Sequence, residues 1–227
     1  MEEHTTRISG VAIHMKTCLK YLGIIPARKG STRVKNKNMT LINGKPLIYW
    51  SVLYAQKSKK LDSFIITTDD EEIIKYAYEY LGVGCMRRNK ELAKDLTSLP
   101  PVLKDVSNRI EADNYVTLRP TSPIRVNNII DKAIFEFENA KVDSLCTGFM
   151  NKEYPAFTIE DTPSQLLDGW FQNNGCVEIH KYDVIANSKS YGKKTHRLPV
   201  DQIYNYEVDT KLDFVIVEAI MKDLGIE

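Results

Sequence analysis

Short apolar runs alternate with amphipathic stretches along most of this chain. Runs typical of buried strands lie at residues 19–26, 63–68, 84–87, 114–118, 144–149 and 176–180. Stretches with apolar residues at helical spacing lie at 47–57, 71–81, 99–110, 126–137 and 211–224. Strands that alternate with helices pack as a mostly parallel sheet with helices on its faces. The pattern therefore predicts an α/β fold with a mostly parallel central sheet flanked by helices.

The charge and length of the chain indicate one globular domain without a polyanionic partner. Hydrophobic residues make up 43% of its 227 residues, and 31 lysines and arginines oppose 30 aspartates and glutamates. A chain of this length can bury a substantial core in one domain, and near-neutral charge does not indicate nucleic acid or an anionic membrane as a partner. We expect residues 15–227 to form a single domain, with 1–14 a flexible N-terminal extension and 150–173 an irregular excursion from the sheet.

The cysteines and the apolar runs bear on the compartment. The four cysteines form no CxxC pair and are widely spaced, at Cys18, Cys85, Cys146 and Cys176. Widely spaced cysteines in strand-like segments are typical of buried free thiols in a reducing compartment. No apolar run approaches the length that spans a bilayer, and residues 1–14 lack the apolar core of a signal peptide. We therefore expect a cytoplasmic protein.

A basic loop, ARKGSTRVKNKN, follows the first predicted strand directly. It contains no acid, and its cations are Arg28, Lys29, Arg33, Lys35 and Lys37. Ligands of open α/β sheets bind beyond the carboxyl ends of the strands, where this loop is expected to lie. Cations and exposed backbone N–H groups can surround a triphosphate there. Taken alone, the loop is equally well explained as a solvated basic turn.

Two common phosphate-binding patterns are absent from the sequence. The Walker pattern GxxxxGKS/T does not occur, which disfavours a P-loop ATPase. The dinucleotide pattern GxGxxG is also missing, because Gly30 stands alone after the first strand, which disfavours hydride transfer. No aromatic residue interleaves with the cations of the loop, so a basic-loop RNA-binding module is disfavoured as well.

A series of motifs runs in a fixed order from about residue 20 to the end of the chain. They are IIPARKGSTRVKNKN, LINGKPLIYWSV, IITTDDEEI, RRNKELAKD, LRPTSPIR, NGCVEI and EVDTKLDF. This ordered set resembles the acylneuraminate cytidylyltransferase family, whose members make CMP-activated acidic sugars. The resemblance implies a Rossmann-like nucleotidyltransferase fold, the use of Mg²⁺, and the coupling of CTP to an acidic 2-keto-3-deoxy sugar with release of pyrophosphate.

The resemblance also implies roles for individual positions. The catalytic residues would be Arg28, Lys37 and Asp209. The nucleotide would be bound by Ala27, Arg28, Gly30, Ser31, Arg33, Lys37, Asn38, Asp69 and Arg88. The sugar would be bound by Arg119, Thr121, Ser122, Arg125, Gln165, Asn174 and Gly175.

Glu207 and Asp209 match the acidic pair that binds Mg²⁺ in the family. Residues two apart in a strand point to the same face, and Mg²⁺ commonly takes one or two carboxylates together with phosphate oxygens and water. Without the resemblance, an ordinary surface pair in which Asp209 caps the following helix would be the favoured interpretation. The resemblance favours the metal site.

Arg119 departs from the pattern of the sialic-acid enzymes, which usually have glutamine at this position. Arg119 and Arg125 could bind a sugar carboxylate or a phosphate, because a guanidinium can donate two parallel hydrogen bonds to either group. Alternatively, they could form structural ion pairs. The alternatives left open are a guanylyl- or other nucleotidyltransferase for a sugar 1-phosphate and a non-catalytic nucleotide-binding regulatory protein.

Two further segments and one histidine complete the sequence predictions. The excursion at 150–173 is shorter than the dimerisation arm usual in the family, so a homodimer is left open as a possible assembly. The cationic segment 193–197 is interpreted as a solvated loop, and His180 as a structural or solvated residue.

Overall fold

A seven-stranded sheet forms the centre of the computed structural model, which describes residues 7–8, 11–12, 19–152 and 169–226. Its strands, in sheet order, are β11 (Thr195–Pro199), β9 (Ser144–Asn151), β10 (Trp170–Lys181), β8 (Ala112–Thr117), β3 (Leu19–Pro26), β6 (Ser63–Thr68) and β7 (Cys85–Arg87). Strand β10 is antiparallel to both of its neighbours, and the other pairs are parallel. The predicted mostly parallel sheet is therefore confirmed.

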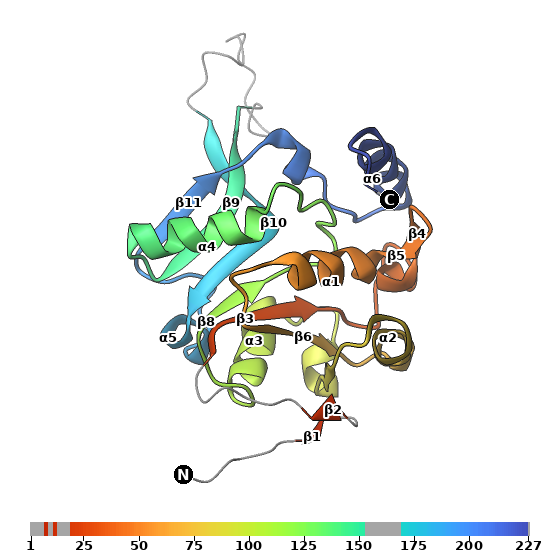
Figure 1. Cartoon of the computed structure of the whole chain (residues 1–227), viewed down its shortest axis with the longest axis horizontal. Helices are drawn as coiled ribbons and strands as arrows, with labels where there is room; N and C mark the ends of the chain where they lie inside the picture. The colour runs from red at the N-terminus through yellow and green to blue at the C-terminus, as the bar shows by residue number, and fades with distance from the viewer. Residues whose placement is uncertain (1–6, 9–10, 13–18, 153–168, 227) are drawn as a thin grey trace.

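Helices cover both faces of this sheet (Figure 1). They are α1 (Leu47–Lys57), α2 (Glu71–Tyr76) with a π turn at Ala77–Leu81, α3 (Leu99–Ser107), α4 (Ile129–Ala140), α5 (Tyr182–Ala186) and α6 (Lys211–Asp223). Helices α1 and α4 lie on one face and α3 and α5 on the other, while α6 lies beside the small hairpin of β4 (Leu41–Ile42) and β5 (Lys45–Pro46). Within the described residues, no helix is long and apolar enough to cross a bilayer.

The central strand β3 shows why the sheet is buried on both faces. Its side chains alternate, so that Tyr21 and Ile25 join the larger apolar cluster while Leu22 and Ile24 join the smaller one. Burial on both faces requires the nearly continuous apolar run that the sequence shows at this strand. The three described cysteines, Cys85, Cys146 and Cys176, are free and buried, as expected; Cys18 lies outside the described residues.

Three segments contain strands that the sequence analysis did not predict. Both ends of the expected excursion at 150–173 are strand, because β9 continues to Asn151 and β10 begins at Trp170; residues 153–168 lie outside the described part. The segment 193–197, expected to be a solvated loop, instead contributes to the edge strand β11. This strand pairs in parallel with β9 and so provides hydrogen-bond partners for backbone groups of β9. Within the expected extension, β1 (Arg7–Ile8) and β2 (Val11–Ala12) form a short antiparallel pair.

A bulge in β10 shapes the sheet where the site lies. Pairing with β9 shifts register between Asn173 and Glu178, and Gly175 in the interruption adopts a φ of 62°, a left-handed conformation that favours glycine. Glu178 also pairs across from Thr117, the last residue of β8. The bulge therefore lies beside the loop that follows β8, at the carboxyl end of the parallel strands.

We expect Gly148→Ala to destabilise the sheet. A Cβ at this position would overlap the carbonyl oxygen of Gln172 and the ring of Phe171 on the paired strand. Overpacking of this kind costs about 1–3 kcal/mol of unfolding free energy, which urea denaturation would measure.

Gly84→Ala is the matched control, because its Cβ would meet only Ile65 Cδ1, at 3.7 Å. Equal unfolding midpoints for the two variants would contradict the close packing of β9 on β10.

Candidate active site

A cleft of about 440 Å³ opens at the carboxyl ends of the parallel strands. It is lined by residues that follow β3, β7 and β8, which is where ligands of open α/β sheets bind. Among the residues predicted to bind nucleotide, it brings together Arg28, Gly30, Ser31, Arg33, Lys37, Asn38 and Arg88. Arg119 and Thr121, predicted to bind the sugar, line the same cleft. The cleft thus joins motifs that are about 90 residues apart in the sequence.

The basic loop is held in place by backbone and amide contacts. Ala27 is buried, and its N–H donates to the Thr67 carbonyl at 3.0 Å, so this residue anchors the loop and does not line the cleft. The Asn38 amide donates to the Arg28 carbonyl at 3.0 Å, and Asp69 accepts from the N–H of Lys29 at 2.9 Å. Asp69 therefore braces the loop from the turn after β6, outside the lining of the cleft.

Three cations of the loop are paired with carboxylates. Lys37 Nζ lies 3.0 Å from Asp209 Oδ1 and donates to the carbonyl of Val208, also at 3.0 Å. Arg33 contacts Asp209 Oδ2 at 3.2 Å, and Arg28 is paired with Asp95. The structure therefore brings Lys37 and Asp209 into direct contact, as expected of residues that share a site, and an incoming polyanion would compete with these carboxylates for the cations.

Arg88 and the start of α3 form the opposite wall. Arg88 is buried and donates through Nη2 to the Thr67 carbonyl at 2.8 Å; its burial lowers its pKa to about 10. Ser98, the N-cap residue of α3, also lines the cleft, so that the positive end of this helix faces it. The sequence analysis missed Ser98, although serine followed by Leu99, Pro100 and Pro101 is a typical helix start.

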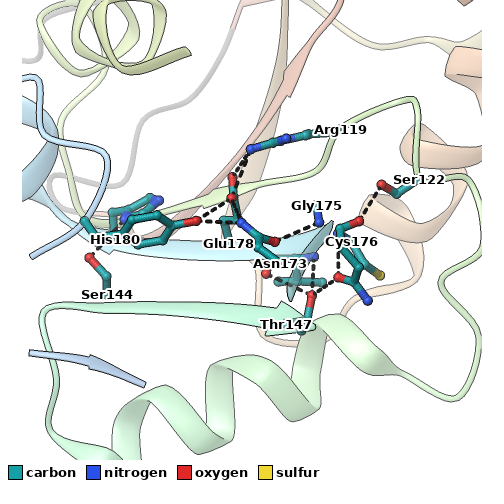
Figure 2. Close-up of polar contacts among 12 residues, drawn as sticks. Arg119, Ser122, Ser144, Thr147, Asn173, Gly175, Cys176, Glu178 and His180 are labelled. Atoms are coloured by element: carbon teal, nitrogen blue, oxygen red, sulfur yellow. Dashed lines mark hydrogen bonds and ion pairs between the residues drawn. The ribbon is translucent and has the colours of Figure 1, made fainter. Parts of the chain in front are cut away.

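On the other side of the cleft, Arg119 contacts a buried carboxylate that the sequence analysis also missed. Its Nη2 donates to both oxygens of Glu178, each at 3.0 Å (Figure 2). Asn173 and Tyr191 donate to the same carboxylate. No local motif indicates this network, because its members come from the loop after β8, from β10 and from the segment before β11.

Arg125 does not line the cleft and lies in the core. Its guanidinium donates to the carbonyls of Cys176 and Arg119, both at 2.7 Å, and to Ser51 Oγ at 3.0 Å. Complete burial lowers its pKa. Arg125 therefore braces the loop after β8 against the β10 bulge. The role in sugar binding that the resemblance implies for Arg125 stays a prediction.

The other residues expected to bind the sugar shape the bulge. Ser122 Oγ donates to the Asn174 carbonyl at 3.1 Å, and Asn174 Oδ1 accepts from Thr147 Oγ1 at 2.7 Å. Both Ser122 and Asn174 are buried. At Gly175, a Cβ would overlap a carboxylate oxygen of Glu207 and approach Arg119 Cδ to 3.1 Å. At Gly175 the bulge therefore packs closely against both Glu207 and Arg119. Gln165, also expected to bind the sugar, lies outside the described residues.

The sequence analysis expected Glu207 and Asp209 to lie in a strand, but in the structure they do not. Residues 206–209 are irregular and are tied to the loop after β8 by the Val208 N–H, which donates to the Thr121 carbonyl at 2.7 Å. Glu207 is half-buried, and burial, with Asp209 adding to it, raises its pKa. Asp209 does not cap α6, because Thr210 does so in a capping box with Asp213.

His180 has a structural role, as predicted. It is buried, its Nδ1 lies 3.0 Å from Ser144 Oγ, and burial lowers its pKa. It is neutral and does not reach the cleft lining.

Comparison with known proteins decides the family. A cytidylyltransferase family model matches residues 22–166. The chain is 31% identical over 224 residues to post-translational flagellin modification protein B of Campylobacter coli, covering 89% of this chain and 95% of that protein. The chain belongs to the cytidylyltransferase family. This cytidylyltransferase is also 29% identical over 218 residues to CMP-N,N'-diacetyllegionaminic acid synthase of Campylobacter jejuni, covering 87% and 93% of the two chains.

The likeness to solved structures supports the fold of this cytidylyltransferase. A structure of CMP:2-keto-3-deoxy-manno-octonic acid synthetase in complex with CTP superposes with a TM-score of 0.71, at 17% identity, over 90% of this chain and 99% of that one. The predicted Rossmann-like nucleotidyltransferase fold is confirmed.

We expect Arg125→Met to lower stability. The substitution leaves the buried carbonyls of Cys176 and Arg119 without their donor, which costs about 2 kcal/mol or more of unfolding free energy. Chemical denaturation would measure this loss.

Arg109→Met is the control, because Arg109 makes its contacts with Asp105 and the Arg87 carbonyl on the surface. A loss at Arg125 no larger than that at Arg109 would argue against the bracing role.

Proposed function

We propose that this cytidylyltransferase couples CTP to a hydroxyl of an acidic 2-keto-3-deoxy sugar. The hydroxyl oxygen attacks the α-phosphorus, the bond from that phosphorus to the β-phosphate oxygen breaks, and the products are the CMP-sugar, pyrophosphate and a proton. The supporting observation is a cleft that joins the basic loop after β3 to Arg119 after β8. A CMP-legionaminic acid synthase among the relatives supports an acidic sugar as the acceptor.

The basic loop is proposed to hold the β- and γ-phosphates. Arg28, Arg33 and Lys37 supply positive charge on the cleft wall, and the turn at Gly30 and Ser31 supplies backbone N–H groups. Negative charge grows on the leaving pyrophosphate during in-line transfer, so fixed cations at that position lower the barrier. The contacts with Asp95 and Asp209 keep these cations at the cleft before the nucleotide arrives.

A magnesium ion is proposed to bind at Asp209, with Glu207 as a second carboxylate. Among the described residues, no cluster of three or more histidine, cysteine or acidic side chains could hold a metal without the substrate. Mg²⁺ fits this donor set, because it commonly binds one or two carboxylates and completes its shell with phosphate oxygens and water. The carboxylate of Asp209 is 36% exposed and lies between two cations that line the cleft. When bound, the ion supplies charge stabilisation for the polyphosphate.

The assembly and the compartment remain predictions. The homodimer suggested by the resemblance depends in part on residues 153–168, which are not described. A cytoplasmic location is supported by the free thiols of Cys85, Cys146 and Cys176, which a reducing compartment preserves.

Pyrophosphate release with CTP, GTP, UTP and ATP tests the proposed function directly. Each nucleotide would be combined with Mg²⁺ and with N,N'-diacetyllegionaminic acid, N-acetylneuraminic acid, 2-keto-3-deoxy-manno-octonic acid or glucose 1-phosphate. We expect turnover with CTP and an acidic sugar. Turnover with GTP and the sugar phosphate would overturn the proposal, and tight nucleotide binding without turnover would favour a regulatory protein.

We expect Asp209→Asn to lower kcat by about a hundredfold or more, because metal-based charge stabilisation is worth several kcal/mol. The fold should be retained, since Asp209 is partly exposed. Binding of CTP without Mg²⁺, measured by calorimetry, should be preserved, which separates loss of the metal from loss of the Lys37 contact.

Asp183→Asn, an exposed change at the first turn of α5, serves as the control and should leave activity unchanged. Near-normal Mg²⁺-dependent turnover in the Asp209 variant would refute the metal assignment.

A further inference from the structure

We propose that Glu178 is a positioning residue for the acceptor sugar. It holds the Arg119 guanidinium at the cleft, and the resulting neutral pair selects an acceptor with a single carboxylate over a sugar phosphate. This inference rests on the proposed function, because it concerns the acceptor side of the same cleft. It assigns a role to a residue that the sequence motifs do not single out.

Glu178 is fully occupied by donors from the protein. Its side chain is buried, with 3% of the residue exposed. Arg119 Nη2 donates to both carboxylate oxygens, Asn173 Nδ2 donates at 2.5 Å, and the Tyr191 hydroxyl donates at 3.0 Å (Figure 2). Burial alone would raise the pKa of Glu178, but the charge of Arg119 and the donated hydrogen bonds hold it below its usual value. Glu178 is therefore ionised, and it cannot itself take up a ligand or a proton at the cleft.

Arg119, in contrast, has donors to spare. Only its Nη2 is engaged with Glu178, and among the described residues its Nε is buried without a hydrogen-bond partner and its Nη1 has none. The side chain is 37% exposed and lines the cleft. A guanidinium carries five N–H donors. With Nη2 engaged and Nε buried, the two N–H groups of Nη1 are left for an oxygen of the ligand. One side of Arg119 is thus fixed by the protein while the other faces the site.

The network that fixes Glu178 continues into the core. Asn173 also accepts from the Gly175 N–H at 2.8 Å, which ties the carboxylate to the bulge of β10. The Tyr191 ring packs against His180, with centroids 5.7 Å apart, and His180 contacts Ser144 (Figure 2). The orientation of Arg119 therefore depends on contacts from β9, β10 and the segment before β11, and not on its own loop alone. Such support holds a binding group in the geometry that the ligand requires.

This side of the cleft has no surplus positive charge, because Glu178 pairs with Arg119 and the Glu207 carboxylate also lies close to it. Arg119 and Glu178 together carry no net charge, whereas the opposite side presents Arg28, Arg33 and Lys37 from the basic loop. A phosphate monoester with nearly two negative charges would lose hydration here without a surplus cation to replace it. A carboxylate carries one charge and can share the guanidinium fork with Glu178. The arrangement thus fits an acidic sugar better than a sugar 1-phosphate.

Glu178→Gln tests this inference with little change in shape. The amide places a donor against the donors of Arg119 and Asn173, so the guanidinium is no longer held and its charge is no longer cancelled. We expect KM for the acidic sugar to rise about tenfold while KM for CTP stays within twofold. The preference for the acidic sugar over glucose 1-phosphate, taken as the ratio of kcat/KM values, should fall about tenfold. An unchanged sugar KM, or an equal rise in both KM values, would overturn the inference.

Two further variants keep the test decisive. Tyr191→Phe removes one donor from Glu178 at an exposed position and should raise the sugar KM about threefold. If Glu178→Gln does not fold, an unchanged sugar KM in Tyr191→Phe overturns the inference.

Glu138→Gln is the control, because Glu138 also bridges two cations, Lys20 and Lys60, but away from the cleft. Wild-type protein that is inactive with every acidic sugar would refute the proposed function itself.

Discussion

The contact between Lys37 and Asp209 closes the basic-loop side of the cleft and joins segments 172 residues apart. Lys37 is largely shielded, with 12% of its side chain exposed, and it also donates to the backbone of Val208. Val208 in turn is bonded to the loop after β8, so one cation connects the basic loop, the acidic segment and the loop that carries Arg119. A partly buried ion pair is screened little by salt, and this allows it to define the shape of the site before any ligand binds.

The fold could be predicted largely from apolar periodicity, and the exceptions have physical causes. The strands at 19–26 and 63–68 and the helix at 47–57 are found with the expected bounds, because buried elements need nearly continuous or helically spaced apolar residues. Strand β11 was missed because an edge strand need not be apolar on either face. The full length of β10 was missed because its first residues, before the bulge, are polar or partly exposed.

The candidate site could be predicted where its residues are contiguous in sequence. The cations of the basic loop and Arg88 follow strand ends, and strand ends meet at one edge of a parallel sheet. Glu178 and Tyr191 could not be found this way, because their contact with Arg119 depends on strand order and on the register of β10. The carbonyl contacts of Arg125 could not be predicted for a related reason: nothing local distinguishes an arginine that binds a ligand from one that binds carbonyls in the core.

The bulge of β10 also determines which changes this part of the molecule can accept. Side chains of a strand alternate between faces, so adding or removing one residue between the two register segments would turn Glu178 away from Arg119 and move the apolar residues that follow. Variation in length is therefore excluded here, unlike in a surface loop. At these positions the chain therefore accepts exchanged side chains on an unchanged backbone more readily than an inserted or deleted residue.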